Sequence, residues 1–437
     1  MKRAKPRNHP EKPAESRLVQ IEKPIYGGSF LARDNGKAMF VPLTLPGEHA
    51  RVRIVDEKRG YSTAEIDEVV TAAPHRIAAN CRHFAACGGC HYQHTDYATQ
   101  LELKQLILRE TLERGGVRAP QEIVVLSGEP WAYRNRIRLA FDRRGNVGYR
   151  ERRSHAVIAI QECPIAAPLL VKAALSVAEL LRDVAPTLRA SELALFCNGD
   201  QTELLASVFV EVPEKLGFDE FARELSKRVT ALRGVELLAE DRQGTSSRQL
   251  AKWGKDSLTY RAGDFDYRVD HGAFFQVNRW LVDALLERVT AAHKGKLAWD
   301  LFAGVGLFAR RLAGDYERVV AVESAPAATS ALAQNLRGTS GETVKAETLG
   351  FLWRRNKDAR PDLIVVDPPR TGLGAETTSL LSQIGAPSLV YVSCDPATLA
   401  RDLRVLTGSG YEMESVTLAD LFPQTFHLET VVHLRRS

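Results

Sequence analysis

The chain has 437 residues, of which 44% are hydrophobic and 26% charged, and its formal net charge is +5. This length predicts two or three domains, no apolar run is long enough for a membrane span, and the modest charge allows a polyanionic partner without requiring one. The first residues lack the apolar segment of a secretory signal. We therefore expect a cytoplasmic protein whose six cysteines serve metal binding or catalysis rather than disulfides.

The N-terminal part of the chain changes character after residue 16. Residues 1–16 are rich in Lys, Arg and Pro and predict a disordered basic arm. Residues 17–74 hold short alternating segments separated by Gly and Pro turns, which predict a small OB-type β-barrel. Such a barrel can bind oligonucleotides, and arginines beside Tyr61 would suit that use. A structural barrel with a solvated basic face fits the pattern equally well.

Three closely spaced cysteines follow the barrel: Cys81, Cys87 and Cys90. Their spacing, with two glycines that let the backbone turn tightly, indicates a metal site. Cys163, in a Cys-Pro turn after an apolar strand, is the best candidate for a fourth ligand. His91 and His94 are the alternatives in a zinc site. The spacing does not separate zinc from a four-thiolate iron–sulfur cluster.

The centre of the chain carries a dense group of arginines. Residues 97–114 have helical periodicity and end at Gly115, and an alternating hairpin follows. This basic hairpin contains eight arginines: Arg134, Arg136, Arg138, Arg143, Arg144, Arg150, Arg152 and Arg153. Because only Asp142 and Glu151 offset them locally, the pattern favours contacts with the phosphates and bases of a nucleic acid over a merely solvated face. Cys197, in an apolar strand further on, is expected to be structural.

The last third predicts a doubly wound α/β sheet with a nucleotide site at its carboxyl edge. An apolar strand ends in Asp300 and a turn with Gly304 and Gly306, and the next strand ends in Glu323. A glycine turn followed about 20 residues later by an acid is the pattern that binds ribose hydroxyls. Because the third glycine of a dinucleotide motif is missing, the pattern favours an adenosine without a pyrophosphate. This suggests S-adenosylmethionine.

Two further strands end in reactive or charged groups. One ends in Asp367-Pro-Pro-Arg370 and the next in Cys394, where a nucleophile would face the same crevice. Taken alone, Cys394 fits a packed core thiol better than a nucleophile. The chain closes with two strands that predict an antiparallel edge carrying His427 and Glu429.

The assembled motifs resemble those of S-adenosylmethionine-dependent RNA uracil-5-methyltransferases, in particular the branch with a TRAM barrel and a [4Fe-4S] cluster that modifies 23S ribosomal RNA. The motifs span nearly the whole chain: IYGGSF, FVPLTLPGE, CRHFAACGGCHYQH, FFQVN, DLFAGVGLF, VVAVE, VVDPPRTGL, VSCDP and FPQTFHLETVVHL. The resemblance implies a cluster on Cys81, Cys87, Cys90 and Cys163. It also implies cofactor contacts, beside Gly304, from Gln276, Phe302, Glu323 and Asp367. Leu307 and Glu347 depart from the family pattern.

The resemblance also implies a chemical mechanism. C5 of uracil is too weak a nucleophile to take a methyl group from a sulfonium, and a thiolate added at C6 turns the ring into an enolate with charge at C5. Cys394 is the implied nucleophile, and Glu429 is the implied base that removes the C5 proton. We expect Arg370 or a backbone dipole to lower the pKa of Cys394. We expect an aromatic side chain to stack on the target base, the candidates being Phe274, Phe275 and Phe426.

These inferences divide the chain into four parts. They are the arm 1–16, the RNA-binding TRAM barrel 17–74, a central α+β domain 75–268 with the iron–sulfur site, and a Rossmann-like class I methyltransferase domain 269–437, on which helix 97–114 could pack. RNA is the expected partner of a monomer, with neither DNA nor a membrane. The alternatives are a tRNA uracil-5-methyltransferase, an amino-group methyltransferase and a non-catalytic iron–sulfur RNA-binding protein.

Overall fold

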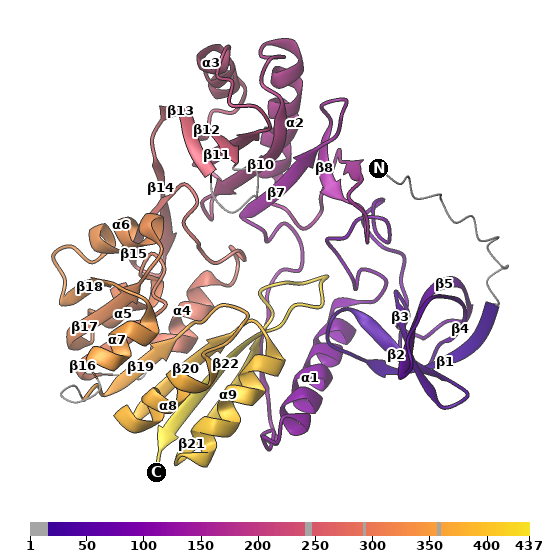
Figure 1. The fold of residues 1–437 in the computed structure, drawn as a ribbon, viewed down its shortest axis with the longest axis vertical. Helices are drawn as coiled ribbons and strands as arrows, with labels where there is room; N and C mark the ends of the chain where they lie inside the picture. The colour runs from indigo at the N-terminus through magenta and orange to yellow at the C-terminus, as the bar shows by residue number, and fades with distance from the viewer. Residues whose placement is uncertain (1–15, 241–246, 292–293, 356–359) are drawn as a thin grey trace, which may run out of the picture.

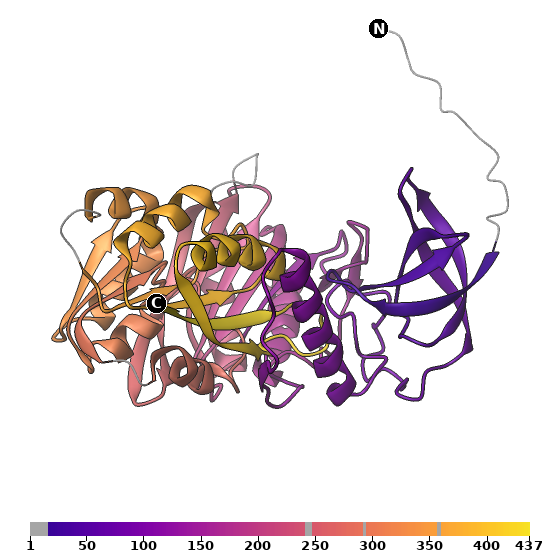
Figure 2. The same cartoon turned by 90° about the horizontal axis from the view of Figure 1, so that it is seen from below.

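The computed structural model describes residues 16–240, 247–291, 294–355 and 360–437. A barrel, a central domain and a C-terminal domain follow one another along the chain (Figure 1). Seen from below, the barrel lies at one end of the molecule and the C-terminal domain extends to the other (Figure 2). The predicted basic arm lies outside the described residues, except for Ser16, which begins the first strand rather than ending the arm.

The first unit is a closed five-stranded barrel, which confirms the predicted barrel. Its strands pair in the order β1-β2-β3-β5-β4. Alternate side chains such as Phe30, Met39 and Val41 point inward and fill the interior, as a small barrel requires. The strands are β1 (Ser16–Pro24), β2 (Ser29–Asp34), β3 (Lys37–Pro42), β4 (His49–Glu57) and β5 (Tyr61–Thr71).

The central domain is a seven-stranded sheet in the order β13-β12-β11-β10-β7-β8-β9. Its strands are β7 (Arg136–Phe141), β8 (Val147–Arg150), β9 (Val157–Ala159), β10 (Ala190–Cys197), β11 (Leu204–Val210), β12 (Leu232–Glu240) and β13 (Ser247–Gly254). Helices α2 (Pro168–Asp183) and α3 (Phe218–Arg228) bury their apolar faces against the sheet. Cys197 is fully buried in this core, as a structural cysteine would be.

The C-terminal domain contains an eight-stranded sheet in the order β18-β17-β16-β19-β20-β22-β21-β6, with apolar cores on both faces. The first five strands in this order, from β18 through β17, β16 and β19 to β20, run parallel to one another, and β22 is antiparallel to both of its neighbours. This arrangement confirms the predicted doubly wound fold and its antiparallel edge. Its strands are β6 (Val124–Leu126), β16 (Gly295–Leu301), β17 (Tyr316–Glu323), β18 (Gly341–Lys345), β19 (Leu363–Val366), β20 (Ser388–Ser393), β21 (Tyr411–Ala419) and β22 (Glu429–Arg436).

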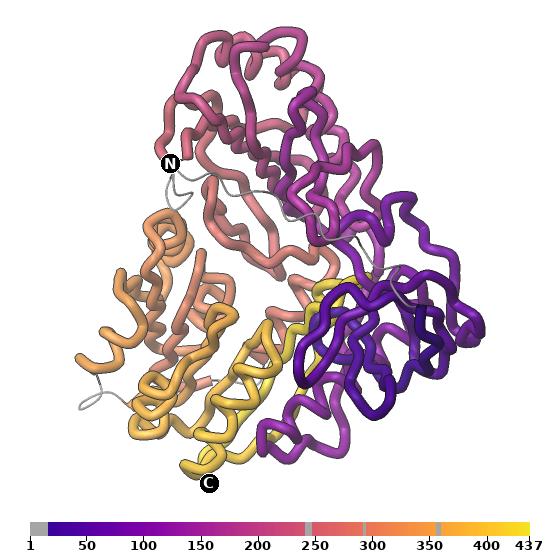
Figure 3. Tube along the Cα trace, turned by 45° about the vertical axis from the view of Figure 1, so that its right-hand side comes forward, coloured from indigo at the N-terminus to yellow at the C-terminus, as the bar shows by residue number. Residues whose placement is uncertain are grey.

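Helices cover this sheet: α4 (Val282–Thr290), α5 (Leu307–Leu312), α6 (Pro326–Asn335), α7 (Thr348–Arg355), α8 (Gly374–Ile384) and α9 (Pro396–Gly408). The hairpin of β14 (Ser257–Ala262) and β15 (Phe265–Asp270) packs on α4, α5 and α6. Helix α1 (Tyr97–Arg114) packs on α9 through Ile107, Leu108 and Leu112. It lies beside the C-terminal elements in Figure 3. Among the described helices, none combines the length and the apolar character that a bilayer crossing needs.

The loop between β21 and β22, residues 420–428, is anchored to α1 by buried polar contacts. Lys104 is fully buried and forms an ion pair with Asp420 at 2.5 Å, and it also donates to the carbonyl of Phe422 at 3.0 Å. Gln100 donates to the Gln424 side chain at 3.0 Å and accepts from the Gln424 amide at 2.9 Å. Breaking a buried pair typically costs about 3–5 kcal/mol, so this terminal loop is firmly placed before it enters β22.

Candidate active site

One cavity of about 660 Å³ lies at the carboxyl ends of the parallel strands β16, β17, β19 and β20. The terminal loop and the segment before α4 complete its wall. All seven predicted catalytic and cofactor residues line it: Gln276, Phe302, Gly304, Glu323, Asp367, Cys394 and Glu429. The carboxyl edge of a parallel sheet is where such folds bind ligands, so this shared cavity is the candidate active site.

The turn after β16 brings backbone amides close to the cavity. Phe302 has a left-handed φ of 64°, which is uncommon for a residue with a side chain and marks a strained turn. Gly306 has a φ of 90°, and a Cβ there would lie 2.6 Å from Leu332, so only glycine fits. Asp300 is buried below the turn, where burial raises its pKa to about 8. Its carboxyl group accepts from the Ala309 amide at 2.8 Å, which ties the turn to α5.

Glu323, at the end of β17, is held with its carboxylate beside this turn. Its oxygens accept hydrogen bonds from the amides of Gly304 at 2.9 Å, Ser324 at 2.8 Å and Ala325 at 2.7 Å. Three amide donors fix an acceptor that keeps lone pairs for the hydroxyls of a ribose. Glu347 lines the cavity as well, so its departure from the family pattern leaves a carboxylate at this wall.

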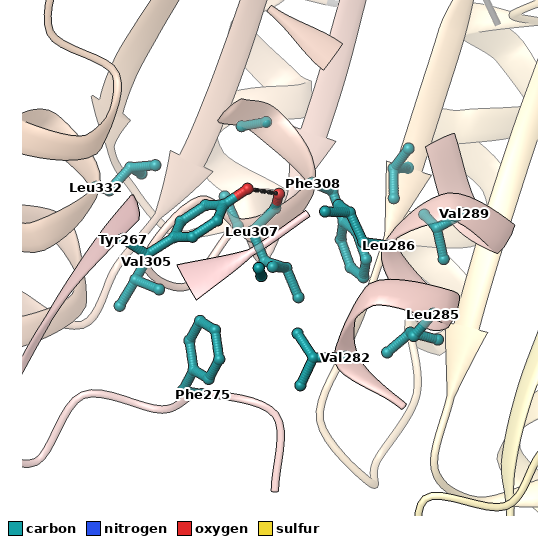
Figure 4. Close-up of a cluster of buried hydrophobic side chains, with 14 of the residues drawn as sticks. Tyr267, Phe275, Val282, Leu285, Leu286, Val289, Val305, Leu307, Phe308 and Leu332 are labelled. Atoms are coloured by element: carbon teal, nitrogen blue, oxygen red, sulfur yellow. Dashed lines mark hydrogen bonds between the residues drawn. The ribbon is translucent and has the colours of Figure 1, made fainter. Parts of the chain in front are cut away.

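Two residues near the site face the core instead (Figure 4). Leu307 is buried, and its carbonyl accepts a hydrogen bond from the Tyr267 hydroxyl at 3.0 Å. Phe275 is 2% exposed and packs against Tyr260 and Tyr267, so the expectation that it could stack on a target base is wrong. The neighbouring Phe274 is 59% exposed and lines the cavity, which leaves its ring free for a ligand.

Cys394 and Glu429 are brought together by strand register. The antiparallel ladder of β20 and β22 pairs Ser393 with Thr430. The next residues, Cys394 and Glu429, therefore face each other where the ladder ends. The barrel reaches the same turn, because the Tyr26 hydroxyl donates to the Cys394 carbonyl at 3.4 Å. One strand pair thus places the predicted nucleophile beside the predicted base.

The thiol of Cys394 is not activated in the free protein. Burial raises its pKa to about 12, and the carboxylates of Glu429 and Asp367 act in the same direction. Arg370 favours the thiolate, but its effect is smaller. The expectation that the site lowers the pKa of Cys394 is therefore wrong for the free protein. Its thiolate has to form while substrates occupy the cavity.

Asp367 and Glu429 form a buried carboxyl pair. Burial raises the pKa of Asp367 to about 7. Burial, and then the charge of Asp367, raise the pKa of Glu429 well above its usual value. Two close carboxylates do not ionise together easily, so the pair retains a proton near neutral pH. Gln276 donates to Asp367 at 3.5 Å, which orients one member of the pair.

His427 is the main residue of the site to which the sequence assigned no role. Its Nδ1 accepts a hydrogen bond from Arg370 at 3.0 Å, and because arginine only donates, the neutral ring carries its hydrogen on Nε2. Burial, and then Arg370, lower the pKa of His427 to about 4, so the ring is neutral at pH 7. Phe426 and Phe422 pack on it with ring centroids 4.3 and 5.5 Å away. Its position two residues before Glu429 is the signal that could have placed it at the same wall.

Phe426, the third predicted stacking residue, does not line the active-site cavity. Its ring packs edge-on against Tyr26 of the barrel, with centroids 5.6 Å apart, and against His91 at 4.7 Å. The amide of His91 also donates to the Gln424 carbonyl at 2.8 Å. Phe426 therefore joins the barrel and the cysteine segment to the terminal loop.

The four predicted metal ligands line a second, smaller cavity of about 40 Å³: Cys81, Cys87, Cys90 and Cys163. His91 and His94, the alternative ligands, do not line it. His94 instead bonds the Thr44 carbonyl at 3.0 Å. Within the described residues, no group of three or more His, Cys, Asp or Glu side chains is placed to hold a metal ion. The structure thus gathers the cysteines around one space without forming the coordination sphere of a single ion.

Comparisons with known proteins agree with this architecture. A TRAM domain model matches residues 11–66, and a model described as tRNA (Uracil-5-)-methyltransferase matches residues 355–437. An uncharacterized RNA methyltransferase of Aquifex aeolicus is 32% identical, over 95% of this chain and 97% of the relative. The 23S rRNA (uracil(1939)-C(5))-methyltransferase RlmD of Pseudomonas entomophila is 31% identical, over 94% of this chain and 92% of its own length.

One solved structure covers almost the whole chain. It is the Pyrococcus abyssi tRNA (uracil-54, C5)-methyltransferase in complex with S-adenosyl-L-homocysteine, with a TM-score of 0.77, 23% identity, and coverage of 96% of this chain and 100% of the other. The fold, the cavity and the relatives define an RNA methyltransferase with an N-terminal TRAM domain. Within that class, the chain belongs to the S-adenosylmethionine-dependent RNA uracil-5-methyltransferase family.

Proposed function

We propose that the enzyme methylates C5 of a uridine in 23S ribosomal RNA through a covalent bond between Cys394 and C6 of the base. The observation that carries this proposal is the meeting of Cys394 and Glu429 in the cavity that also holds the predicted cofactor residues. The RNA assignment rests on relatives named as 23S rRNA methyltransferases.

Each catalytic residue has a defined task in this mechanism. S-adenosylmethionine supplies an electrophilic methyl group and a positive charge when it is bound. Cys394 adds to C6 as a thiolate, and the pair of electrons of the C5–C6 double bond moves towards C5 and O4. After C5 has gained the methyl group, Glu429 removes its proton, and the electrons of that bond restore the double bond and release the sulfur. Glu323 and Gly304 would hold the cofactor, with Phe302, Gln276 and Asp367 on the same wall.

His427 fits the place where charge develops on the base. The enolate formed by addition at C6 carries negative charge on O4, and a neutral histidine with hydrogen on Nε2 can donate to that oxygen. His427→Phe keeps the ring contacts and removes the donor. We expect kcat to fall roughly 100-fold, the usual effect of losing one such donor, with little change in KM for RNA.

A substrate variant tests this role of His427. RNA with 4-thiouridine at the target has a weaker acceptor at this position, so the wild-type enzyme should lose part of the same stabilisation. The loss caused by His427→Phe should therefore be smaller on 4-thiouridine than on uridine. An equal loss on both substrates would show that His427 only supports the structure of the loop.

Whether the substrate is ribosomal RNA or tRNA can be determined by direct mapping of 5-methyluridine. The family model that matches the C-terminal part is described by a tRNA activity, which keeps tRNA as the second candidate. We expect RNA from cells lacking the protein to lose one 5-methyluridine in 23S ribosomal RNA. Loss of the modification from tRNA alone would instead assign the enzyme to tRNA.

We further propose that the four cysteines hold a [4Fe-4S] cluster. Their shared cavity is larger than the roughly 10–15 Å³ that one water requires, and its lining is largely apolar. Arg134 lines it and Arg152 interacts with Cys87 and Cys90, so cations are present to balance an anionic cluster. The cluster would cross-link the segment before α1 to residue 163 of the central domain and so stabilise the fold.

Metal analysis tests the cluster without reference to activity. Protein purified without oxygen should contain iron and acid-labile sulfide and absorb broadly in visible light. Cys163→Ser should lose most of the iron, whereas Cys197→Ser should retain it, because Cys197 is buried in the separate core of the central sheet. Stoichiometric zinc without iron would contradict the proposal.

A further inference from the structure

A second groove lies next to the active-site cavity, on the central sheet. It has a volume of about 510 Å³ and is lined by strands β7, β10, β11, β12 and β13 and by residues 270–272. Gly272 lines both this groove and the active-site cavity, so the two spaces adjoin. A strand of RNA whose target base enters the active site can therefore continue along this groove.

Arg136, on β7, is a cation in this groove for which the described part of the chain supplies no counter-ion. Its guanidinium lies over the ring of Phe196, 4.4 Å from the centroid. Its Nε is buried without a hydrogen-bond partner, and among the described residues no carboxylate forms an ion pair with it. Burial lowers its pKa to about 10, which leaves it charged at pH 7. A half-buried charge without an ion pair has lost part of its hydration without compensation, so a bound anion would stabilise this guanidinium.

The carboxylates that line the groove accept hydrogen bonds from neighbouring side chains. Glu236 accepts from Ser207 at 2.6 Å and from Gln249 at 3.3 Å. Asp270 accepts from Arg268 at 2.6 Å. Among the described residues that line the groove, Arg136 is therefore the cation left without an ion pair, while the carboxylates accept from donors of their own.

Arg138 provides an internal comparison, because it lies two residues further along the same strand. It also stacks on an aromatic ring, that of Phe209, at 4.5 Å. In contrast to Arg136, it forms ion pairs with Glu192 at 2.5 Å and Glu240 at 2.9 Å. Two arginines of the same basic hairpin thus differ in their carboxylate partners and in exposure, because Arg138 is exposed and Arg136 is half-buried.

We propose that Arg136 binds a backbone phosphate of the substrate RNA, near the target uridine in the chain. A guanidinium donates two hydrogen bonds to a phosphate in a fixed geometry and supplies the missing counter-charge. The Phe196 ring holds the guanidinium plane in place. The inference rests on RNA being the substrate, but it does not depend on the covalent mechanism.

The test compares Arg136→Gln with Arg138→Gln in RNA binding at several salt concentrations. Losing one phosphate contact should weaken RNA binding and reduce the slope of log K against log salt by about 0.7 to 0.9. Arg138→Gln should change this slope less. A single neutral methylphosphonate in the RNA should weaken binding by the wild type, and at the contacted position it should not weaken binding by Arg136→Gln further.

Thermal unfolding of the free protein gives an independent readout. Arg136→Gln removes a half-buried charge that forms no ion pair among the described residues, so its Tm should equal or exceed that of the wild type. Arg138→Gln loses two ion pairs and should not gain stability. Unchanged RNA affinity and salt slope in Arg136→Gln would overturn the proposal, as would equal slope changes in both variants. Binding is measured without turnover, so these outcomes do not depend on whether Cys394 forms a covalent bond.

Discussion

Replacing Cys394 by alanine should abolish methyl transfer while RNA and S-adenosylmethionine still bind. In the proposed mechanism the thiolate is the group that makes C5 nucleophilic, and the cavity offers no second thiol within its described lining. Removing a covalent nucleophile from a catalytic unit can cost on the order of 10⁶-fold in kcat. Transfer of a labelled methyl group to RNA measures the loss, and binding of labelled RNA measures what is retained.

A matched control separates chemistry from folding. Cys197→Ala also removes a buried thiol, but in the core of the central sheet, so it should leave the rate almost unchanged. RNA carrying 5-fluorouridine at the target should trap a covalent complex with the wild type and with Cys197→Ala, because fluorine at C5 cannot leave as a proton. Normal turnover by Cys394→Ala, or a trapped complex with that variant, would contradict the role assigned to Cys394.

The convergence of the site was predictable because it follows from the topology of the sheet. Strands that run parallel end at one edge, so the acid after β17, the Asp-Pro-Pro turn after β19 and the cysteine after β20 had to meet. The closing hairpin was predicted as an antiparallel edge. Its register, with Ser393 opposite Thr430, then places Glu429 beside Cys394.

The pKa values of the site residues could not be predicted from the sequence in the same way. The pKa of Cys394 depends on Asp367 and Glu429, which come from other strands, and on burial, which the local sequence does not show. The basic hairpin gives a second example. Its arginines look alike in sequence, but Arg138 and Arg150 pair with Glu192, which lies outside the hairpin, while Arg136 has no such partner. Partners distant in sequence decide which charges are available to RNA.

Glu429→Gln should stop the reaction one step later than Cys394→Ala. Glutamine has nearly the same shape but cannot accept a proton, so Cys394 can still add to C6 and the methyl group can still be transferred. The product cannot then lose the C5 proton, and the protein–RNA adduct should accumulate. Denaturing electrophoresis should show a methylated covalent complex with uridine-containing RNA, at a yield near one per active site, while release of free product falls by several orders of magnitude.

The raised pKa of Glu429 adds a pH dependence with a definite sign. Its base form is present only above that pKa, so kcat/KM of the wild type should rise with pH well above the usual range for a carboxylic acid. A glutamate whose pKa is raised by folding destabilises the folded state as pH increases above its unfolded value. Glutamine does not ionise, so Glu429→Gln avoids this destabilisation. The difference in Tm between Glu429→Gln and the wild type should therefore increase from acid to neutral pH, in favour of the variant.

Glu414→Gln is a suitable control, because Glu414 lies on the neighbouring strand β21 and pairs with Arg435 away from the active-site cavity. It should release methylated RNA at the wild-type rate and leave no adduct. If Glu429→Gln also releases product normally, another group removes the proton, and Asp367, the other member of the buried pair, becomes the candidate. If neither adduct nor product forms, Glu429 acts before the methyl transfer, and the proton it controls is that of the Cys394 thiol, whose pKa its charge raises.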